Sequence, residues 1–384
     1  MTNKPLSVLC VIDHLGPGGA QRQMTALACA LKEHGHSVEI FLYFPDQRFF
    51  RPIVDRSKIT VHEATKGKGF SLSVFWALVN TIRRRKYDVV VSYLGSPNVY
   101  TELCALVTRS SKFIVSERSS FRADRSRVGA LVRRWLHALA DHVVTNSHEQ
   151  AQWLRGKSWL VHKVTCIYNG LDLESFDPTW SELARDGEDV RLLGIGRIGP
   201  EKNLLHLIEA MCLLEEEGRR LPFVSWVGRQ DASENGLAYR AKVDDLLARR
   251  PKVASHWKWL GERDDVVELL AQHHALIHPS FYEGLPNVVC EAMAAGRPAL
   301  VSRVCDHPVL ILDGQRGFLF NPDSPPEIAR AIDRFAALST SERLSLGRNA
   351  RAYAAANLSI RTMVGAYGAL FSRLLDDSPC NGNV

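Results

Sequence analysis

The 384-residue chain has no long hydrophobic run. Its N-terminal apolar stretch, Leu6–Ile12, ends at Asp13 and His14. A signal-peptide core needs a longer run than this, and a membrane-spanning helix needs about 20 apolar residues. Long polar low-complexity tracts are also absent, so disorder is expected only at the ends, such as residues 376–384. The sequence therefore predicts a soluble chain that is not exported.

The chain also lacks the common cysteine and histidine metal motifs. Its 8 cysteines include no C-x-x-C pair; Cys10 and Cys166 lie in apolar strand-like runs, and Cys29, Cys212 and Cys290 in helical patterns. We interpret them as buried free thiols in a reducing cytoplasm. The histidines of residues 272–280 belong to no H-E-x-x-H arrangement. No metal ion and no cofactor is expected.

Charge is nearly balanced, with 48 Lys and Arg against 42 Asp and Glu, but the basic residues are concentrated in the first half. They gather in residues 83–86 and in residues 118–134. Such a surface favours anionic partners: phosphosugars, anionic lipid head groups or nucleic acid. Nucleic acid is the least favoured, because no aromatic residues interleave with the basic clusters as a stacking platform requires.

The second basic stretch continues into a helix-like pattern over residues 126–144. Its apolar positions are Val128, Leu131, Val132, Trp135, Leu136 and Leu139, with arginines on the other side. We expect this helix to pack on the core with a solvated basic face. The alternative is a basic surface that rests on an anionic membrane, which would place a cytoplasmic protein at the inner face of the cytoplasmic membrane.

Continuous apolar runs alternate with helical patterns along both halves of the chain. The predicted strands lie in residues 6–12, 38–44, 88–94, 112–117, 142–147, 164–168, 190–196, 222–228, 253–261, 275–280 and 297–302. Runs of this kind predict parallel sheets covered on both faces, in two doubly wound, Rossmann-like α/β domains with a ligand cleft between them. We place the N-terminal domain at 1–172, a linker at 173–189, the C-terminal domain at 190–357, and a helix that packs back on the N-terminal domain, followed by a frayed tail, at 358–384.

The first glycine-rich turn follows the first predicted strand. Gly16 and Gly18 fit the dinucleotide fingerprint, but Gln21 replaces its third glycine. No G-x-x-x-x-G-K-[ST] loop is present either. What remains is a Gly18–Gly19 turn with Arg22 one helical turn on, which suits an anionic or sugar ligand, or is only a tight strand-to-helix connection.

Two loops of the second half contain charged residues with a clearer chemical role. In residues 194–210, Arg197 and Lys202 lie between a strand end and a helix start, where two cations and helix-terminal N–H groups suit a diphosphate. In residues 276–301, a polar loop with Glu283 precedes a helix predicted from Asn287 to Ala295, in which Glu291 follows Asn287 by one turn. The two carboxylates can hold hydroxyl groups on either side of a phosphate that rests on the N–H groups of Gly284 and Leu285.

These motifs together resemble a known family. Glu283 and Glu291 are separated by seven residues within "FYEGLPNVVCEAMAAGRP". Upstream of them the chain carries, in this order, "PGGAQR", "NSHEQAQWL", "YNGLDLESF" and "GRIGPEKN". The chain thereby resembles the retaining GT-B glycosyltransferases of family four from residue 6 to about residue 370.

The resemblance implies roles for individual residues. Arg197 and Lys202 would neutralise the donor diphosphate, Glu283 would contact the donor sugar near the transferred carbon, and Glu291 would accept hydrogen bonds from the ribose hydroxyls. The loop and helix start would bind the donor through Gly284, Leu285, Pro286 and Asn287. Gly18, Gly19 and Arg22 would close over the donor from the N-terminal domain. Many relatives have a histidine where this chain has Glu117 and Arg118, so these two are candidates for the acceptor side.

The activity so implied is transfer, with retention and without a metal, of a hexose or N-acetylhexosamine from a nucleoside diphosphate sugar, UDP-sugar favoured. The acceptor would be a glycan hydroxyl, on a lipid-linked intermediate of surface polysaccharide synthesis. A nucleotide-sugar 2-epimerase of the same fold and a non-catalytic nucleotide-sugar-binding protein are the alternatives. The nucleotide base, the sugar, the acceptor and the oligomeric state stay open.

Overall fold

The computed structural model describes residues 4–118, 127–176 and 189–376. It divides into a first unit, Met1–Gly170 with Leu358–Val384, and a second unit, Leu171–Asn357. Most of the linker predicted at 173–189, the basic residues 119–126 and the predicted frayed tail at 377–384 lie outside the described residues.

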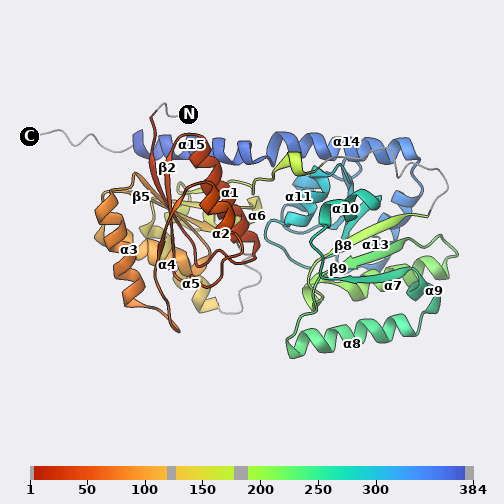
Figure 1. The fold of residues 1–384 in the computed structure, drawn as a ribbon. Helices are drawn as coiled ribbons and strands as arrows, with labels where there is room; N and C mark the ends of the chain where they lie inside the picture. Colours follow the sequence, from red (N-terminus) through yellow and green to blue (C-terminus); the bar gives the residue numbers. More distant parts are fainter. Residues whose placement is uncertain (1–3, 119–126, 177–188, 377–384) are drawn as a thin grey trace, which may run out of the picture. The chain divides into compact units, whose positions relative to one another are not determined.

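The first unit is built on a parallel seven-stranded sheet in the order β3-β2-β1-β4-β5-β6-β7 (Figure 1). Its strands are β1 (Ser7–Val11), β2 (Ser37–Leu42), β3 (Thr60–Glu63), β4 (Val89–Tyr93), β5 (Lys112–Glu117), β6 (His142–Thr145) and β7 (Val164–Cys166). Its longer helices are α1 (Gly19–Glu33), α2 (Arg51–Arg56), α3 (Leu72–Arg85), α4 (Gly95–Val107), α5 (Arg127–Leu136), α6 (His148–Arg155) and α15 (Ile360–Asp376). From β1 at the centre, successive strands are added first on one side (β2, β3) and then on the other (β4 to β7), as in a doubly wound fold.

Alternate residues of β1 fill two separate apolar clusters, one on each face of the sheet. Val8 and Cys10 of β1 pack in one cluster with residues of α1 and α15, whereas Leu9 and Val11 pack in the other with residues of α3 and α4. Both faces are therefore buried, which explains why the strands read as continuous apolar runs and not as alternating ones.

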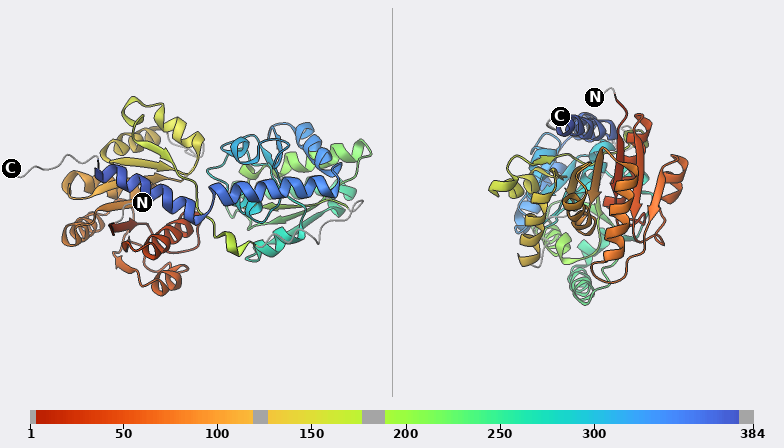
Figure 2. Two further views of the ribbon diagram at one scale, coloured as in Figure 1. Left: turned by 90° about the horizontal axis from the view of Figure 1, so that it is seen from above. Right: turned by 90° about the vertical axis from the view of Figure 1, so that its left-hand side faces the viewer.

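Helix α15 completes the first unit although it comes last in the chain. It buries Met363, Val364, Tyr367, Leu370 and Phe371 in the same cluster as α1. The hydroxyl oxygen of Tyr367 lies 2.9 Å from that of Tyr93, at the end of β4. Figure 2 shows α15 beside α1 in this unit.

The second unit has a parallel six-stranded sheet in the order β10-β9-β8-β11-β12-β13. Its strands are β8 (Arg191–Ile195), β9 (Phe223–Val227), β10 (Trp257–Gly261), β11 (Ala275–His278), β12 (Ala299–Ser302) and β13 (Gly317–Phe320). Its helices are α7 (Leu204–Glu216), α8 (Glu234–Ala248), α9 (Pro251–Ser255), α10 (Val266–Gln272), α11 (Asn287–Ala294), α12 (His307–Ile311), α13 (Pro325–Ala336) and α14 (Thr340–Asn357). The predicted fold class, two Rossmann-like α/β domains, is confirmed.

One large cluster on a face of this second sheet includes Trp226, the largest fully buried side chain. A Cβ on Gly194 would lie 2.2 Å from the ring of Trp226, so the neighbouring strand β8 needs a glycine there. The indole nitrogen of Trp226 donates to the carbonyl oxygen of Gly196, 2.9 Å away. This bond fixes the carboxyl end of β8, from which the candidate site is built.

The structure departs from the predicted elements at several places. Strands β3 and β13 have only 4 residues each and were not predicted. Residues 253–255, predicted as the start of a strand, belong to α9, and β10 begins at Trp257. In α5, Leu131, Val132 and Trp135 are 47%, 52% and 57% exposed, so the prediction that they face the core was wrong.

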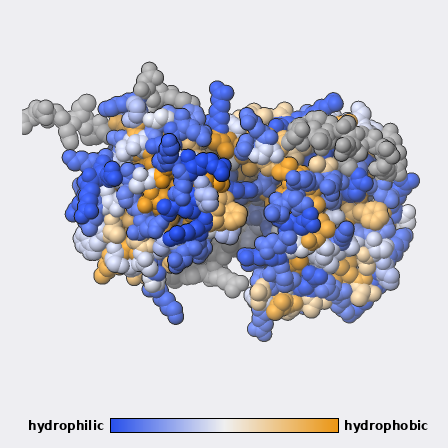
Figure 3. Space-filling view, viewed as in Figure 1, coloured by the Kyte–Doolittle hydropathy of each residue, from blue (hydrophilic) through white to orange (hydrophobic). Residues whose placement is uncertain are grey.

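No helix in the described parts of the chain is long and apolar enough to cross a bilayer. On the side shown in Figure 3, each unit carries mostly polar residues, with apolar ones in patches between them. Single exposed apolar residues are normal on protein surfaces.

Truncation of Phe371 tests how far the first unit depends on α15. This side chain is fully buried, so Phe371→Ala should lower the free energy of unfolding by about 3–5 kcal/mol. Urea unfolding of the full chain followed by circular dichroism measures the change. Arg361→Ala, an exposed position of the same helix, is the control and should cost less than about 0.5 kcal/mol. Equal stability of the two variants would contradict a structural role for α15.

Candidate active site

The predicted donor-side residues of the second unit follow the carboxyl ends of β8 and β11. Arg197 and Lys202 lie in the loop after β8, the latter at the end of the 3-10 helix η5 (Pro200–Lys202). Glu283 lies in the loop after β11, which pairs directly with β8. Because the strands are parallel, both loops leave the same edge of the sheet, the usual ligand-binding edge of this fold.

The structure joins Lys202 and Glu283 in a partly buried ion pair. Nζ of Lys202 lies 2.5 Å from Oε1 of Glu283, and the side chains are 16% and 15% exposed. His278, the last residue of β11, places its Nε2 2.8 Å from the same oxygen. The hydroxyl of Ser280 is 3.1 Å from this Nε2. A carboxylate is thus held from two sides at the edge of the sheet.

These contacts set the protonation states. Burial lowers the pKa of His278, against the effect of Glu283, so the imidazole is neutral and donates from Nε2. Burial alone would raise the pKa of Glu283, but donation from His278 and the Lys202 ammonium hold it well below its usual range. Glu283 is therefore an ionised, oriented carboxylate throughout the physiological pH range.

Two residues without a predicted role position Lys202. A Cβ on Gly196 would lie 2.9 Å from Cε of Lys202. The lysine side chain therefore packs against the backbone of Gly196, in space that any other residue would fill with its own side chain. Asn203 is buried and has a left-handed backbone, with φ of 57°. Its Nδ2 donates to the carbonyl oxygens of Pro279 and Pro322, 3.1 and 2.7 Å away. Asn203 thereby ties together the loops after β8, β11 and β13.

Arg197 is 47% exposed and is held by two carboxylates. Its Nη2 lies 2.6 Å from Oε1 of Glu201, and its Nη1 lies 3.6 Å from Oδ2 of Asp231, in the loop after β9. Hydrogen bonding to Glu201 raises the pKa of Arg197. The guanidinium thus remains at the edge of the sheet as a fixed positive charge, with half of its surface open to solvent.

The second glutamate lies in α11, which the structure begins at Asn287, as predicted, and ends at Ala294. Gly296 follows with φ of 67°, the left-handed conformation that ends helices. Glu291 is buried, and so is Leu285 in the preceding loop. The thiol of Cys305, in the loop after β12, lies 2.6 Å from the carbonyl oxygen of Gly284.

In the first unit, the predicted glycine-rich loop connects β1 to α1. Gly18 precedes α1, Gly19 is its first residue, and the amide of Arg22 donates to the carbonyl oxygen of Gly18, 2.9 Å away. The side chain of Gln21 folds back against this turn: its Nε2 donates to Oδ1 of Asp13, 2.9 Å away, and its Oε1 would lie 2.2 Å from a Cβ on Gly18. The Gln21 side chain therefore occupies the space beside Gly18.

Glu117, the last residue of β5, belongs to a buried cluster of three ionisable groups. His137, the first residue of the 3-10 helix η2 (His137–Leu139), lies between two carboxylates. Its Nε2 is 3.2 Å from Oε1 of Glu117, and its Nδ1 is 2.5 Å from Oε1 of Glu102, in α4. Burial alone would lower the pKa of His137, but the two glutamates raise it to about 9.

Arg118, the other candidate of this strand end, is engaged within the first unit. Its guanidinium carbon lies 3.7 Å from the centre of the Tyr93 ring, Nε donates to the hydroxyl of Ser116, and Nη2 donates to the hydroxyl of Tyr367, 3.0 Å away. Nη1 donates to the side-chain oxygen of Asn169. These contacts connect β5 to α15.

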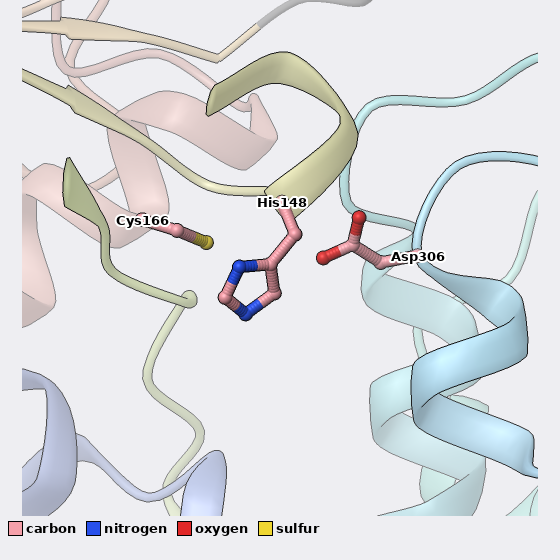
Figure 4. Close-up of side chains that lie close together, drawn as sticks. All are labelled: His148, Cys166 and Asp306. Carbon is pink, nitrogen blue, oxygen red and sulfur yellow. The ribbon is translucent and has the colours of Figure 1, made fainter. Parts of the chain in front are cut away.

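Figure 4 draws three further side chains of a kind that can ligate metal ions. His148 is the first residue of α6 and Cys166 the last of β7, both in the first unit, whereas Asp306 precedes α12 in the second. Neither unit supplies three ligands from this set, and we propose no metal site.

The sequence analysis predicted no role for four residues of these clusters: His137, Glu102, Glu201 and Asn203. Glu201 and Asn203 stand next to Lys202 in a motif already singled out, so local spacing could have found them. No local signal connects Glu102, Glu117 and His137, which come from three elements and are brought together only by the fold.

Two family descriptions match adjacent parts of the chain. "Glycosyltransferase Family 4" matches residues 17–175 and "Glycosyl transferases group 1" matches residues 189–337. The chain belongs to the family 4 glycosyltransferases.

Two curated relatives of this glycosyltransferase come from Escherichia coli. A UDP-Gal:alpha-D-GlcNAc-diphosphoundecaprenol alpha-1,3-galactosyltransferase of Escherichia coli is 24% identical over 67% of this chain and 68% of its own. The lipopolysaccharide glucosyltransferase WaaG of the same species is 23% identical over 90% of this chain and 93% of its own.

Solved structures share the fold of the whole glycosyltransferase. A glycosyltransferase from Rickettsia africae superposes with a TM-score of 0.82 at 18% identity, covering 97% of this chain and all of the other. HepE from Anabaena, solved in complex with UDP, superposes with a TM-score of 0.80 at 21% identity, covering 96% of this chain and all of the other.

The buried histidine of the first unit should make stability depend on pH. The pKa of His137 is about 9 in the folded chain and 6.5 in an ordinary setting, so its stabilisation is complete below pH 6.5 and is lost as pH rises through 9. The free energy of unfolding should fall by at most about 3 kcal/mol over this range relative to His137→Gln, measured by urea unfolding.

His142→Gln is the control, because burial lowers the pKa of His142 to about 4 and its effect changes only below pH 6.5. Parallel stability curves for the wild type and His137→Gln between pH 6.5 and 9 would contradict the charged state of His137.

Proposed function

We propose that this glycosyltransferase moves a hexose or N-acetylhexosamine from a UDP-sugar to a glycan hydroxyl of a lipid-linked intermediate, with retention of configuration and without a metal. The observation that supports the proposal is the partly buried Lys202–Glu283–His278 group at the carboxyl edge of the second sheet, together with Arg197 in the same loop as Lys202. It combines cations for a leaving diphosphate with an oriented carboxylate for a sugar.

The leaving group sets the main electrostatic demand. When the bond between sugar and phosphate breaks, negative charge grows on the diphosphate and positive charge on the sugar. Arg197 and Lys202 would neutralise the diphosphate, which requires them to exchange part of their contact with Glu201 and Glu283 for phosphate oxygens. His278 would then continue to hold Glu283.

The remaining donor contacts follow from the loop after β11 and the start of α11. Glu283 would accept hydrogen bonds from the sugar near the transferred carbon, and Glu291 from the ribose hydroxyls. The backbone of Gly284 and Leu285, with Pro286 and Asn287 at the start of α11, would lie along the phosphates.

The acceptor side would come from the first unit. Gly18, Gly19 and Arg22 lie at the start of α1, following the carboxyl end of β1, and Glu117 ends β5 in the same parallel sheet. We assign the acceptor contact to Glu117, and to Arg118 the role of holding the end of β5 through Asn169 and Tyr367.

The relatives support the choice of donor and acceptor. The galactosyltransferase of Escherichia coli is named for UDP-Gal and a diphosphoundecaprenol-linked sugar, and HepE has been solved with UDP-glucose. A nucleotide-sugar 2-epimerase and a non-catalytic nucleotide-sugar-binding protein remain the alternatives, because both can use the same second unit.

A donor panel separates these functions. We expect release of the nucleoside diphosphate from one of UDP-glucose, UDP-galactose, UDP-N-acetylglucosamine, UDP-N-acetylgalactosamine and GDP-mannose. Release should occur in EDTA, and should be many times faster with a membrane-lipid extract as acceptor than with water alone. Glu283→Gln should reduce the rate at least about 100-fold, because it removes the oriented charge at the reacting sugar. Glu268→Gln, an exposed position of α10, should not.

The two alternatives give different results in the same panel. Conversion of the donor into its 2-epimer without extract would identify an epimerase. Donor binding with no turnover under any condition would identify a binding protein, and a need for added divalent metal would contradict the metal-free mechanism.

We also propose that the first unit rests on anionic lipid at the inner face of the cytoplasmic membrane through α5. Leu131, Val132 and Trp135 of this helix are exposed, and Arg133 and Arg134 lie between them in the sequence. Exposed apolar side chains beside arginines suit the boundary between head groups and acyl chains.

Vesicle binding tests this surface. The wild type should co-sediment with phosphatidylglycerol vesicles at low salt and less with phosphatidylcholine vesicles. A Leu131→Ser, Val132→Ser double variant should bind about tenfold more weakly, because apolar area is lost from the contact. Leu237→Ser, equally exposed in the second unit, serves as the control. Wild type that stays in the supernatant with anionic vesicles at low salt would rule the surface out.

A further inference from the structure

The buried cluster of Glu102, His137 and Glu117 has no role in the donor site described above. Its members come from α4, η2 and β5, and all three belong to the first unit. Glu102 is 1% exposed, His137 is 2% exposed, and Glu117 is 8% exposed. Two carboxylates and an imidazole are thus almost removed from water inside one domain.

Stability alone does not account for such a cluster. Moving charges out of water costs several kcal/mol for each ion, and apolar side chains of similar volume usually stabilise as well or better. What a buried ion group does provide is a fixed geometry, because each partner must stay in place to keep the others compensated.

The fold indicates that Glu117 is the group whose position the cluster fixes. It is the last residue of β5 and lies at the carboxyl edge of a parallel sheet, where ligands bind in this architecture. Glu102 lies inside α4 and reaches the sheet edge only through His137, at 2.5 Å from Nδ1. The contacts therefore run from Glu102 through His137 to Glu117, from the interior toward the ligand edge.

Few other charged side chains act on the Glu102–His137–Glu117 cluster. Arg133 of α5 attracts the charge of Glu117, whereas the guanidinium of Arg118 is engaged by Ser116, Asn169 and Tyr367. The 3-10 helix that packs against η2, Ser158–Leu160, has no ionisable side chain. The two glutamates are thus the carboxylates that face His137.

We propose that His137, held by Glu102, is a positioning residue that keeps the Glu117 carboxylate charged and aimed at the acceptor hydroxyl. Glu117 accepts a hydrogen bond from that hydroxyl and orients its oxygen for attack, while His137 and Glu102 do not touch the substrate. This rests on the proposed transferase function and adds to it the residues that determine acceptor binding.

The pH dependence of Glu102→Gln tests the proposal. The substitution keeps the shape of the side chain and an oxygen that accepts from Nδ1, but it removes one of the two charges that keep His137 protonated. Its kcat/KM for the acceptor, relative to the wild type, should fall about tenfold between pH 6.5 and 8.5, because the imidazole loses its proton in this range. The assay follows UDP release with the membrane-lipid extract as acceptor.

Two controls separate positioning from a structural role. UDP release without extract, which is transfer to water, should not differ between the wild type and Glu102→Gln at either pH. Glu33→Gln, at an exposed position of α1, should follow the wild type in both assays. If Glu102→Gln does not fold, as judged by thermal unfolding, His137→Gln replaces it, and its acceptor kcat/KM should be low at both pH values with water transfer retained.

The outcomes distinguish this inference from the proposed function. Wild-type transfer to the extract, with a ratio of variant to wild type that does not change with pH, overturns the positioning role and leaves the transferase in place. No extract-dependent UDP release by the wild type overturns the transferase and the positioning role with it. An equal pH-dependent loss in water transfer overturns the assignment of the cluster to the acceptor.

Discussion

Both units are governed by the same constraint: a parallel sheet covered on both faces favours apolar side chains along its strands and leaves most ionisable groups to the strand ends and the loops after them. In the first unit the two faces of β1 are filled by separate apolar clusters, and in the second Trp226 and its neighbours fill one face of β9. Ionisable groups such as Lys202, Glu283 and Glu117 are therefore placed at the edges, where loops diverge. Buried there, they must compensate one another.

The two units meet this requirement with opposite arrangements. In the second unit one carboxylate, Glu283, is shared by an ammonium and a neutral imidazole. In the first, one imidazole is shared by two carboxylates, which favours its charged form. The same side-chain type is thus neutral in one sheet edge and charged in the other, because its neighbours differ.

The sequence predicted the fold well, and the structure brings into contact two residues that the sequence singled out in separate loops, Lys202 and Glu283. Strands that are buried on both faces appear in the sequence as long apolar runs. Lys202 and Glu283 lie in loops that contain recognisable turn and helix-cap residues. Strand β3 was missed because it buries none of its four residues and therefore leaves no apolar run. Helix α5 was misjudged because an amphipathic pattern does not say whether its apolar side is covered. His137 and Glu102 could not be predicted, since the pairing of α4 with η2 exists only after folding.

The path of the chain has a consequence for its synthesis. The first unit begins near the N-terminus but needs α15 to complete one of its apolar clusters, whereas the second unit is one continuous segment, Leu171–Asn357. Domains tend to fold as units during synthesis. Every residue of the second unit is synthesised before α15, so the unit that starts the chain is the last to close its core.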